Sequence, residues 1–220
     1  AGEWKVMIFT CVRDGGDGLV DYLEPKAVDA FIKLTYQAYH DAMPDQFGAT
    51  IDGAFYDEPA SHHVQGSRAW TDRFNERFTE RFKTNPITLY PALWFDIGPD
   101  TAAARSALFG MRAELYATGF VKTISDWCTA HHMDLTGHAD QEEAVDPVIG
   151  TVGDLIQSFK YQSMPGDDRP AKDAAGVTES GKPAAESNGV KFLRMENGAA
   201  VFAVGSGTWR FQSPLSEATE

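Results

Sequence analysis

Short apolar runs alternate with longer amphipathic stretches before residue 168 of this 220-residue chain. The runs at residues 4–12 (WKVMIFTCV) and 51–57 (IDGAFYD) are rich in aromatic and branched side chains, which is typical of buried β-strands. Between them, from Pro25 to about Met43, apolar residues recur every three or four positions, as in an amphipathic helix that Pro44 ends. The order strand, helix, strand predicts a parallel β-α-β unit.

The same patterns continue beyond the second strand. They predict helices over residues 70–82, 100–132 and 154–161, and a short strand over residues 134–138. Residues 169–189 are rich in Ala, Gly, Pro, Ser, Lys and Glu without periodicity, which predicts a linker. Short β runs follow at residues 191–195, 199–204 and 208–211, separated by glycines, and predict a small β-meander.

Together these elements predict an α/β fold that is part of a (β/α)8 TIM barrel. We expect a partial barrel over residues 1–168, a linker over residues 169–189 and a C-terminal β segment over residues 190–220. Three strands cannot close an eight-stranded barrel, so the chain is expected to be incomplete. Its sheet edges would then stay exposed, which favours self-association.

The composition of the chain limits its possible binding partners but does not indicate a reaction. The formal net charge is −13 and the pI about 4.8, which argues against nucleic acid or an anionic membrane as the main partner. Cys11 and Cys128 lie in apolar contexts and predict two buried thiols. No apolar run reaches the length of a membrane span and no signal peptide is evident. The chain begins with Ala, which is compatible with a processed secreted or periplasmic protein or with an excerpt, so the compartment stays open.

The strongest chemical signal lies where the strand at residues 51–57 ends. Asp57 and Glu58 are adjacent there, and Pro59 cannot continue a β ladder. Barrels and open α/β sheets place their active sites at the carboxyl ends of strands. The alternative is structural: Asp57 caps a turn and Glu58 is a solvated loop acid.

A second group of polar residues follows the strand at residues 134–138. His138 ends that strand, and Glu142 and Glu143 come shortly after it. The carboxyl ends of parallel strands share one face, so Glu58 and the pair Glu142/Glu143 are predicted to converge. Two facing carboxyls are what glycoside hydrolysis requires, one as a proton donor and one to activate water or attack the sugar. The alternative for Glu142 and Glu143 is a solvated charge cluster.

The histidines suggest a different chemistry. His138 lies near the predicted acids, and further histidines occur at His62, His63, His131 and His132. None of them has the H-E-x-x-H spacing or another specific ligand pattern, so transition-metal chemistry is the weaker hypothesis. There is neither a P-loop nor a G-x-S-x-G motif.

An ordered set of motifs resembles α-L-rhamnosidase-type glycoside hydrolases, most closely glycoside hydrolase family 106. The set covers about residues 4–168 and comprises Asp21-Tyr22-Leu23, Phe55-Tyr56-Asp57-Glu58-Pro59, Trp70-Thr71, Pro91-Ala92-Leu93, Trp127-Cys128, Thr136-Gly137-His138 with Glu142, and Met164-Pro165-Gly166-Asp167. Residues 204–211 resemble the end of the C-terminal β-sandwich of that family. The family's remaining barrel strands have no counterpart in between.

The resemblance implies a (β/α)8 catalytic barrel, an inverting mechanism with two glutamates, and calcium as a possible cofactor. By position, Glu58 and Glu142 would be the catalytic pair, with Glu143 a close competitor of Glu142 and Glu58 favoured as the general acid. Asp57, His138, Trp70 and Asp167 would bind or shape the site for a carbohydrate substrate.

Three hypotheses follow from the sequence. The first is a glycosidase of the α-L-rhamnosidase type. The second is a non-catalytic carbohydrate-binding remnant of such an enzyme, because part of the barrel is missing. The third is a metal-dependent hydrolase or lyase.

Overall fold

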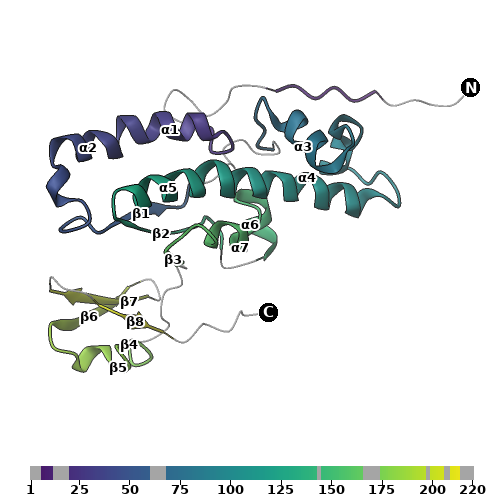
Figure 1. Ribbon diagram of the computed structural model, residues 1–220. Coiled ribbons are helices and arrows are strands. Elements are labelled where there is room, and N and C mark those ends of the chain that lie inside the picture. The colour runs from purple at the N-terminus through teal and green to yellow at the C-terminus, as the bar shows by residue number, and fades with distance from the viewer. Residues whose placement is uncertain are drawn as a thin grey trace, which may run out of the picture. The chain divides into compact units, whose positions relative to one another are not determined.

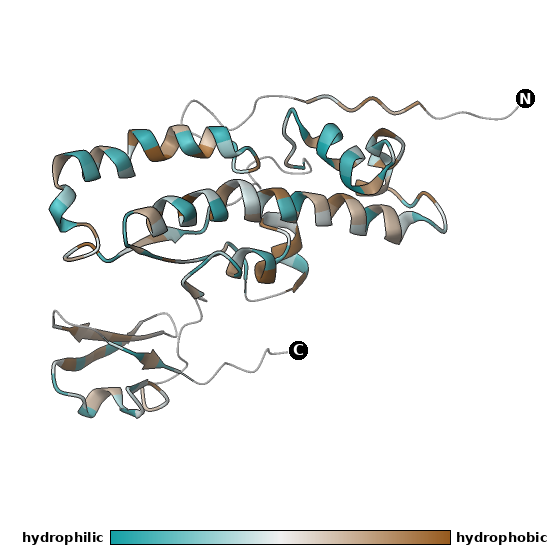
Figure 2. Cartoon of the chain, viewed as in Figure 1, coloured by the Kyte–Doolittle hydropathy of each residue, from teal (hydrophilic) through white to brown (hydrophobic). Residues whose placement is uncertain are grey.

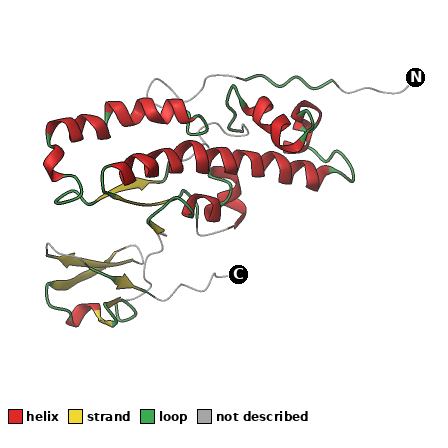
Figure 3. Cartoon of the chain, in the orientation of Figure 1, coloured by secondary structure: helices red, strands yellow, loops and turns green. Residues whose placement is uncertain are grey.

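The computed structural model describes residues 6–11, 20–59, 68–142, 145–165, 174–196, 199–205 and 209–213. The chain divides into two compact units, residues 1–167 and residues 168–220. The first unit combines many helices with a short sheet, and the second is mainly β (Figure 3). Figure 1 labels the elements along the chain.

The helices of the first unit occupy most of the predicted helical stretches. Their bounds are α1 Pro25–Leu34, α2 Tyr36–Ala42, α3 Phe74–Phe82, α4 Thr101–Tyr116, α5 Lys122–Ala130, α6 Val145–Thr151 and α7 Leu155–Phe159. Short 3-10 turns are η1 Pro44–Gln46, η2 Pro86–Thr88 and η3 Tyr90–Leu93. The sequence did not predict α6.

The helix predicted from Pro25 to Met43 is interrupted at Thr35. The Thr35 hydroxyl donates to the carbonyl of Phe31 at 2.7 Å, and its backbone leaves the helical region at φ −118° and ψ −84°. Val28 and Ile32 are buried on the inner side of α1, and Figure 2 shows hydrophobic and hydrophilic residues on different sides of this helix. The predicted amphipathic face is therefore confirmed for α1, whereas α2 has no buried residue, and the helix forms as two segments.

The helix predicted over residues 100–132 forms one long rod. It consists of α4, the π-helical turn η4 (Ala117–Val121) and α5, and it runs beside the sheet (Figure 1). Its inner face carries fully or nearly fully buried side chains, among them Leu108, Tyr116, Val121 and Ile124. This face is the largest part of the core that supports the strands.

The sheet of the first unit is parallel and has the order β1-β2-β3. Its strands are β1 Gly53–Asp57, β2 Asp134–His138 and β3 Met164–Pro165. The strands predicted at residues 51–57 and 134–138 are thus confirmed. Tyr56 pairs with Gly137 and Asp57 pairs with His138 in the β1–β2 register.

The structure corrects the expected barrel. The described residues of the first unit form a three-stranded parallel sheet and no closed barrel. Residues 6–11, inside the predicted first strand, have no regular secondary structure, and Val6 and Ile8 are both 84% exposed. The aromatic ring of Phe9 stacks on Trp94 with centroids 5.2 Å apart. This segment contacts η3 through an aromatic side chain and does not pair with β1.

The second unit is built from short antiparallel strands. One sheet has the order β5-β4-β8 (Lys182–Pro183, Thr178–Glu179, Phe211–Gln212), and β6 (Val190–Glu196) pairs with β7 (Ala199–Val204). The sequence predicted a linker over residues 169–189, whereas residues 174–189 contain β4, β5 and the 3-10 turn η5 (Ala184–Glu186). β8 pairs with β4 and not with β7, so the predicted meander is replaced by two sheets. Val177, Ala184 and Val190 form a small core here.

Two sequence expectations concern cysteine and membranes. Cys128 is buried as predicted, and burial raises the pKa of its thiol to about 11, whereas Cys11 is exposed. No helix among the described residues is long and apolar enough to cross a bilayer.

Gly137 fixes how β1 and β2 meet. It has φ +156°, and a Cβ there would lie 2.5 Å from the Tyr56 carbonyl oxygen and 2.6 Å from its ring. We predict that Gly137→Ala lowers the free energy of unfolding by about 2–4 kcal/mol, because it adds both backbone strain and a clash. Urea denaturation measures this change.

The matched control is Gly110→Ala in α4. A Cβ at Gly110 meets nothing within 4 Å. Alanine also favours the helix over glycine, so this variant should gain up to about 1 kcal/mol. Equal effects of the two substitutions would contradict the described contact between Gly137 and Tyr56.

Candidate active site

The carboxyl ends of β1 and β2 bring four of the predicted site residues together. His138 Nε2 lies 3.3 Å from Asp57 Oδ1, and His138 Nδ1 lies 3.9 Å from Glu58 Oε1. His138 Nδ1 also lies 4.0 Å from Glu142 Oε1. We refer to Asp57, Glu58, His138 and Glu142 as the His138 cluster.

Strand register explains why Asp57 and His138 meet. Side chains alternate between the two faces of a strand, and Asp57 is directly beside His138 in the parallel register. Phe55 and Thr136, two positions earlier in the register, lie on the same face. Phe55 is 57% exposed, and its ring packs edge-on against His138 with centroids 5.2 Å apart. The face therefore combines an open aromatic ring with a carboxylate and an imidazole.

The other face of the same strands is buried at Tyr56, Leu135 and Gly137. The Tyr56 ring packs against Phe120 with centroids 5.3 Å apart. Gln162 donates from Nε2 to the Tyr56 hydroxyl, and also to the Gly137 carbonyl at 3.2 Å. Gln162 thereby ties the segment after α7 to both strands immediately beneath the His138 cluster.

Glu58 itself has an uncommon backbone conformation. Its φ is +46°, which is unfavourable for a residue with a side chain and costs about 1–3 kcal/mol. Two contacts hold it: the Glu58 N–H donates to the His138 carbonyl at 3.2 Å, and the Tyr116 hydroxyl donates to the Pro59 carbonyl at 2.7 Å. Backbone strain that is maintained in this way is common at functional sites.

The two glutamates of the cluster have different surroundings. The Glu58 side chain is 47% exposed, whereas that of Glu142 is 2% exposed. Glu142 Oε2 accepts a 2.8 Å hydrogen bond from the Ala139 N–H, which fixes the carboxylate after β2. Both Oε1 atoms are close to the same ring nitrogen, so they lie no more than 7.9 Å apart, the sum of 3.9 and 4.0 Å.

The other predicted site residues lie elsewhere or outside the described residues. Trp70 is half-buried, packs against the core, and donates from its indole N–H to the Tyr90 hydroxyl at 3.0 Å. None of its described contacts is with the His138 cluster. Glu143 and Asp167, as well as His62 and His63, lie outside the described residues.

Sequence reasoning missed the residues that support the cluster from below. Tyr116 and Gln162 are both buried, and each uses a polar atom to hold backbone beside the site. A tyrosine on the core side of a long helix gives a weak signal, because an aromatic residue there also suits simple packing. Gln162 follows a helix, where a polar residue is ordinary.

Calcium, which the resemblance implied, meets an unsuitable set of donors here. Calcium takes six to eight oxygen ligands. Of the described residues, Asp57, Glu58 and His138 are the group whose donor atoms lie together, all within 4.8 Å of one another, and one of the three donors is an imidazole nitrogen. This set does not fit calcium.

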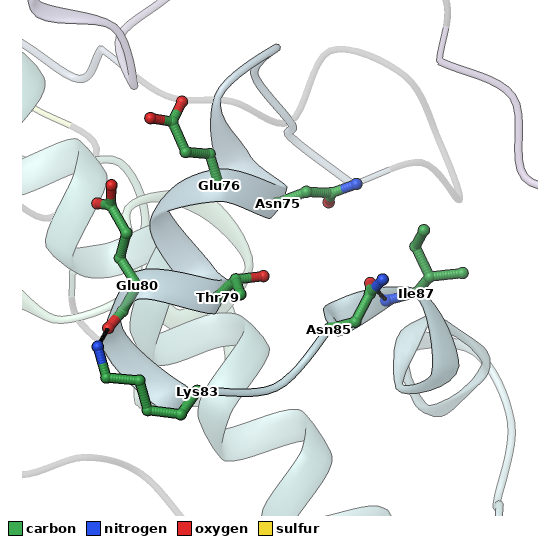
Figure 4. Close-up of a pocket in the computed structure, with 7 residues that line it drawn as sticks. All are labelled: Asn75, Glu76, Thr79, Glu80, Lys83, Asn85 and Ile87. Carbon is green, nitrogen blue, oxygen red and sulfur yellow. Dashed lines mark hydrogen bonds between the residues drawn. The ribbon is translucent and has the colours of Figure 1, made fainter.

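A separate hollow of about 600 Å³ lies between α3 and η2. Figure 4 shows it, lined by Asn75, Glu76, Thr79, Glu80, Lys83, Asn85 and Ile87. Lys83 Nζ donates to the Glu80 carbonyl, and Asn85 Oδ1 accepts from the Ile87 N–H. These polar groups stabilise local turns, and none of the predicted site residues contributes to the hollow.

No protein-family model matches the chain, and the search of curated proteins found no match. A structure of a rhamnosidase from Novosphingobium sp. PP1Y resembles part of it, with 19% sequence identity and a TM-score of 0.46. The match covers 64% of this chain and 13% of that chain. The present chain thus spans a small part of that protein's length, and the similarity is distant.

Burial of Tyr56 predicts a pH dependence of stability. Desolvation, which outweighs the opposing hydrogen bond from Gln162, and the smaller effect of the Glu142 charge together raise the pKa of Tyr56 to about 12. An unfolded tyrosine ionises near pH 10. Between these values the unfolded chain binds fewer protons than the folded chain, so the free energy of unfolding falls as pH rises.

We therefore expect Tyr56→Phe to flatten this fall between about pH 10 and 12 by up to about 1.4 kcal/mol per pH unit. Urea denaturation at several pH values measures the slope, and Tyr39→Phe, which removes an exposed phenol, is the matched control. Identical slopes for the wild type and Tyr56→Phe would contradict the described environment of Tyr56.

Proposed function

We propose that this chain carries the acid–base pair of a glycoside hydrolase, Glu58 and Glu142, which cleaves terminal sugars of the α-L-rhamnoside class. The observation that supports this best is that both carboxyls approach one imidazole nitrogen, at 3.9 and 4.0 Å. Two carboxyls from the ends of neighbouring strands provide the pair that this chemistry needs. The choice of sugar rests on the ordered motifs in the sequence.

The proposed roles follow from the inverting mechanism. Glu58, which is exposed, gives its proton to the glycosidic oxygen as the bond to the anomeric carbon breaks. Glu142 accepts a proton from the water whose oxygen attacks the opposite face of the sugar. Inverting pairs are about 6.5–9.5 Å apart. The Oε1 atoms lie at most 7.9 Å apart, so this mechanism requires a separation in the upper part of what the two distances allow.

The remaining residues of the cluster would bind the sugar. Asp57 has a 75% exposed side chain and can accept hydrogen bonds from sugar hydroxyls. His138 lies between the acids and can orient them. The exposed ring of Phe55 on the same face offers an apolar surface for a sugar ring.

A second candidate is carbohydrate binding without turnover. The burial of Glu142 favours it, because a carboxyl that is 2% exposed and held by the Ala139 N–H is poorly placed to activate a water. Calorimetric binding of a rhamnoside with no release of product would support this candidate. Clear turnover would exclude it.

The test is hydrolysis of aryl and alkyl α-L-rhamnosides by the full chain. We expect Glu58→Gln and Glu142→Gln each to lower kcat/KM by about 10²–10⁴-fold, the usual contribution of a general acid or base. A good leaving group needs less protonation, so Glu58→Gln should retain more activity on nitrophenyl than on methyl rhamnoside. Glu142→Gln should lose activity on both equally.

The matched control is Glu80→Gln on the exposed surface of α3, which should keep wild-type kinetics. Full activity of either Glu58→Gln or Glu142→Gln would refute the assignment of that residue. Circular dichroism of each variant separates loss of catalysis from loss of fold.

A further inference from the structure

The outer part of the His138 cluster has the composition of a metal site. Asp57 and Glu58 come from the end of β1 and His138 from the end of β2, and one donor atom from each lies within 4.8 Å of the other two. We propose that Asp57, Glu58 and His138 bind a divalent transition-metal ion of the zinc class and select it over calcium.

The distances within the cluster suit ligands of one ion. Zinc binds imidazole nitrogen and carboxylate oxygen at about 2.0–2.2 Å, so two tetrahedral ligands lie roughly 3.4 Å apart. His138 Nε2 and Asp57 Oδ1 are 3.3 Å apart. Glu58, the next residue after Asp57, supplies a second carboxylate, whose Oε1 lies 3.9 Å from Nδ1 of the same ring. Nε2 is the ring nitrogen nearest to Asp57, and we assign it as the ligand atom of His138.

The other ring nitrogen faces a carboxylate. Among the described residues, His138 Nδ1 is buried and has no hydrogen-bond partner. The Glu142 carboxylate lies 4.0 Å from it and is fixed by the Ala139 N–H. Metal-binding histidines usually direct their second N–H towards a carboxylate, which sets the ring orientation and strengthens the ligand. Glu142 fits this positioning role.

Charge and exposure also favour a small dication. Asp57 and Glu58 together carry two negative charges, which a divalent ion would neutralise, and the chain has a net charge of −13. Their side chains are 75% and 47% exposed, so coordination positions stay open to water or hydroxyl groups. An imidazole with two carboxylates is a donor set that suits zinc or a similar ion better than calcium.

This inference goes beyond the proposed hydrolysis and shares Glu58 with it. A Glu58 carboxylate that binds a metal cannot also hold the proton for the leaving group. Loading the site should therefore inhibit rhamnoside hydrolysis if both proposals hold. The decisive test measures the ion alone, so failure to bind it leaves the acid–base proposal standing.

The experiment titrates the full chain, stripped with chelator, with Co²⁺ and records visible absorption. We expect one Co²⁺ per chain, with absorption bands that indicate nitrogen ligation, and its displacement by Zn²⁺ but not by equimolar Ca²⁺. His138→Gln and Asp57→Asn should each abolish the bands. Glu142→Gln should weaken binding by about 10–100-fold, as expected for loss of a carboxylate that orients a ligand.

The control is His40→Gln. His40 in α2 and His131 just after α5 pack with ring centroids 4.4 Å apart. This pair of imidazoles is a second place where Co²⁺ can bind, so the variant separates it from the His138 cluster. Co²⁺ bands that vanish in His40→Gln, or that persist unchanged in Asp57→Asn, would overturn the proposal. So would equal affinity for Ca²⁺ and Co²⁺ in the wild type. Asp57 is an exposed side chain, so its variant tests the site even if His138→Gln does not fold.

Discussion

The close approach of Tyr56 to Gly137 is the contact on which the candidate site depends. The Tyr56 ring occupies the space where any other residue at position 137 would place its Cβ. This contact sets the register that puts Asp57 beside His138 on the opposite face. Gln162 donates hydrogen bonds to both the Tyr56 hydroxyl and the Gly137 carbonyl. The segment just before β3 is therefore held against the Tyr56–Gly137 contact.

The side chains of the site become more exposed to solvent with distance from this contact. Tyr56 and Gln162 are buried, His138 is partly covered, and Asp57 and Glu58 reach the surface. Glu142 departs from this order, because its carboxyl lies buried beside the inner nitrogen of the imidazole. The same geometry gives Glu142 two possible tasks: activating a water in hydrolysis, or orienting His138 towards a metal. Which ligand occupies the outer part of the cluster decides between them.

Local sequence signals predicted the elements that carry the site. The aromatic run ending in Asp57 and the T-G-H run ending in His138 both form strands, and the long periodic helix between them packs on one face. The strand predicted at residues 4–12 does not form over its described part, residues 6–11. An apolar strand pattern forms a strand only where the edge of another strand is available for pairing, and Phe9 stacks on Trp94 instead. Gln162 and Tyr116 could not be found from the sequence, because their roles arise from contacts across the fold. The folded residues 174–189 were missed because very short strands leave little periodicity.

If Glu58 and Glu142 act on the two faces of a bound sugar, with the attacking water on the side of Glu142, hydrolysis inverts the anomeric carbon. Proton NMR during the first minutes of hydrolysis of an aryl α-L-rhamnoside identifies the anomer released before mutarotation. We expect β-L-rhamnose to appear first. Initial release of the α anomer, or no release of rhamnose by the folded chain, would contradict it.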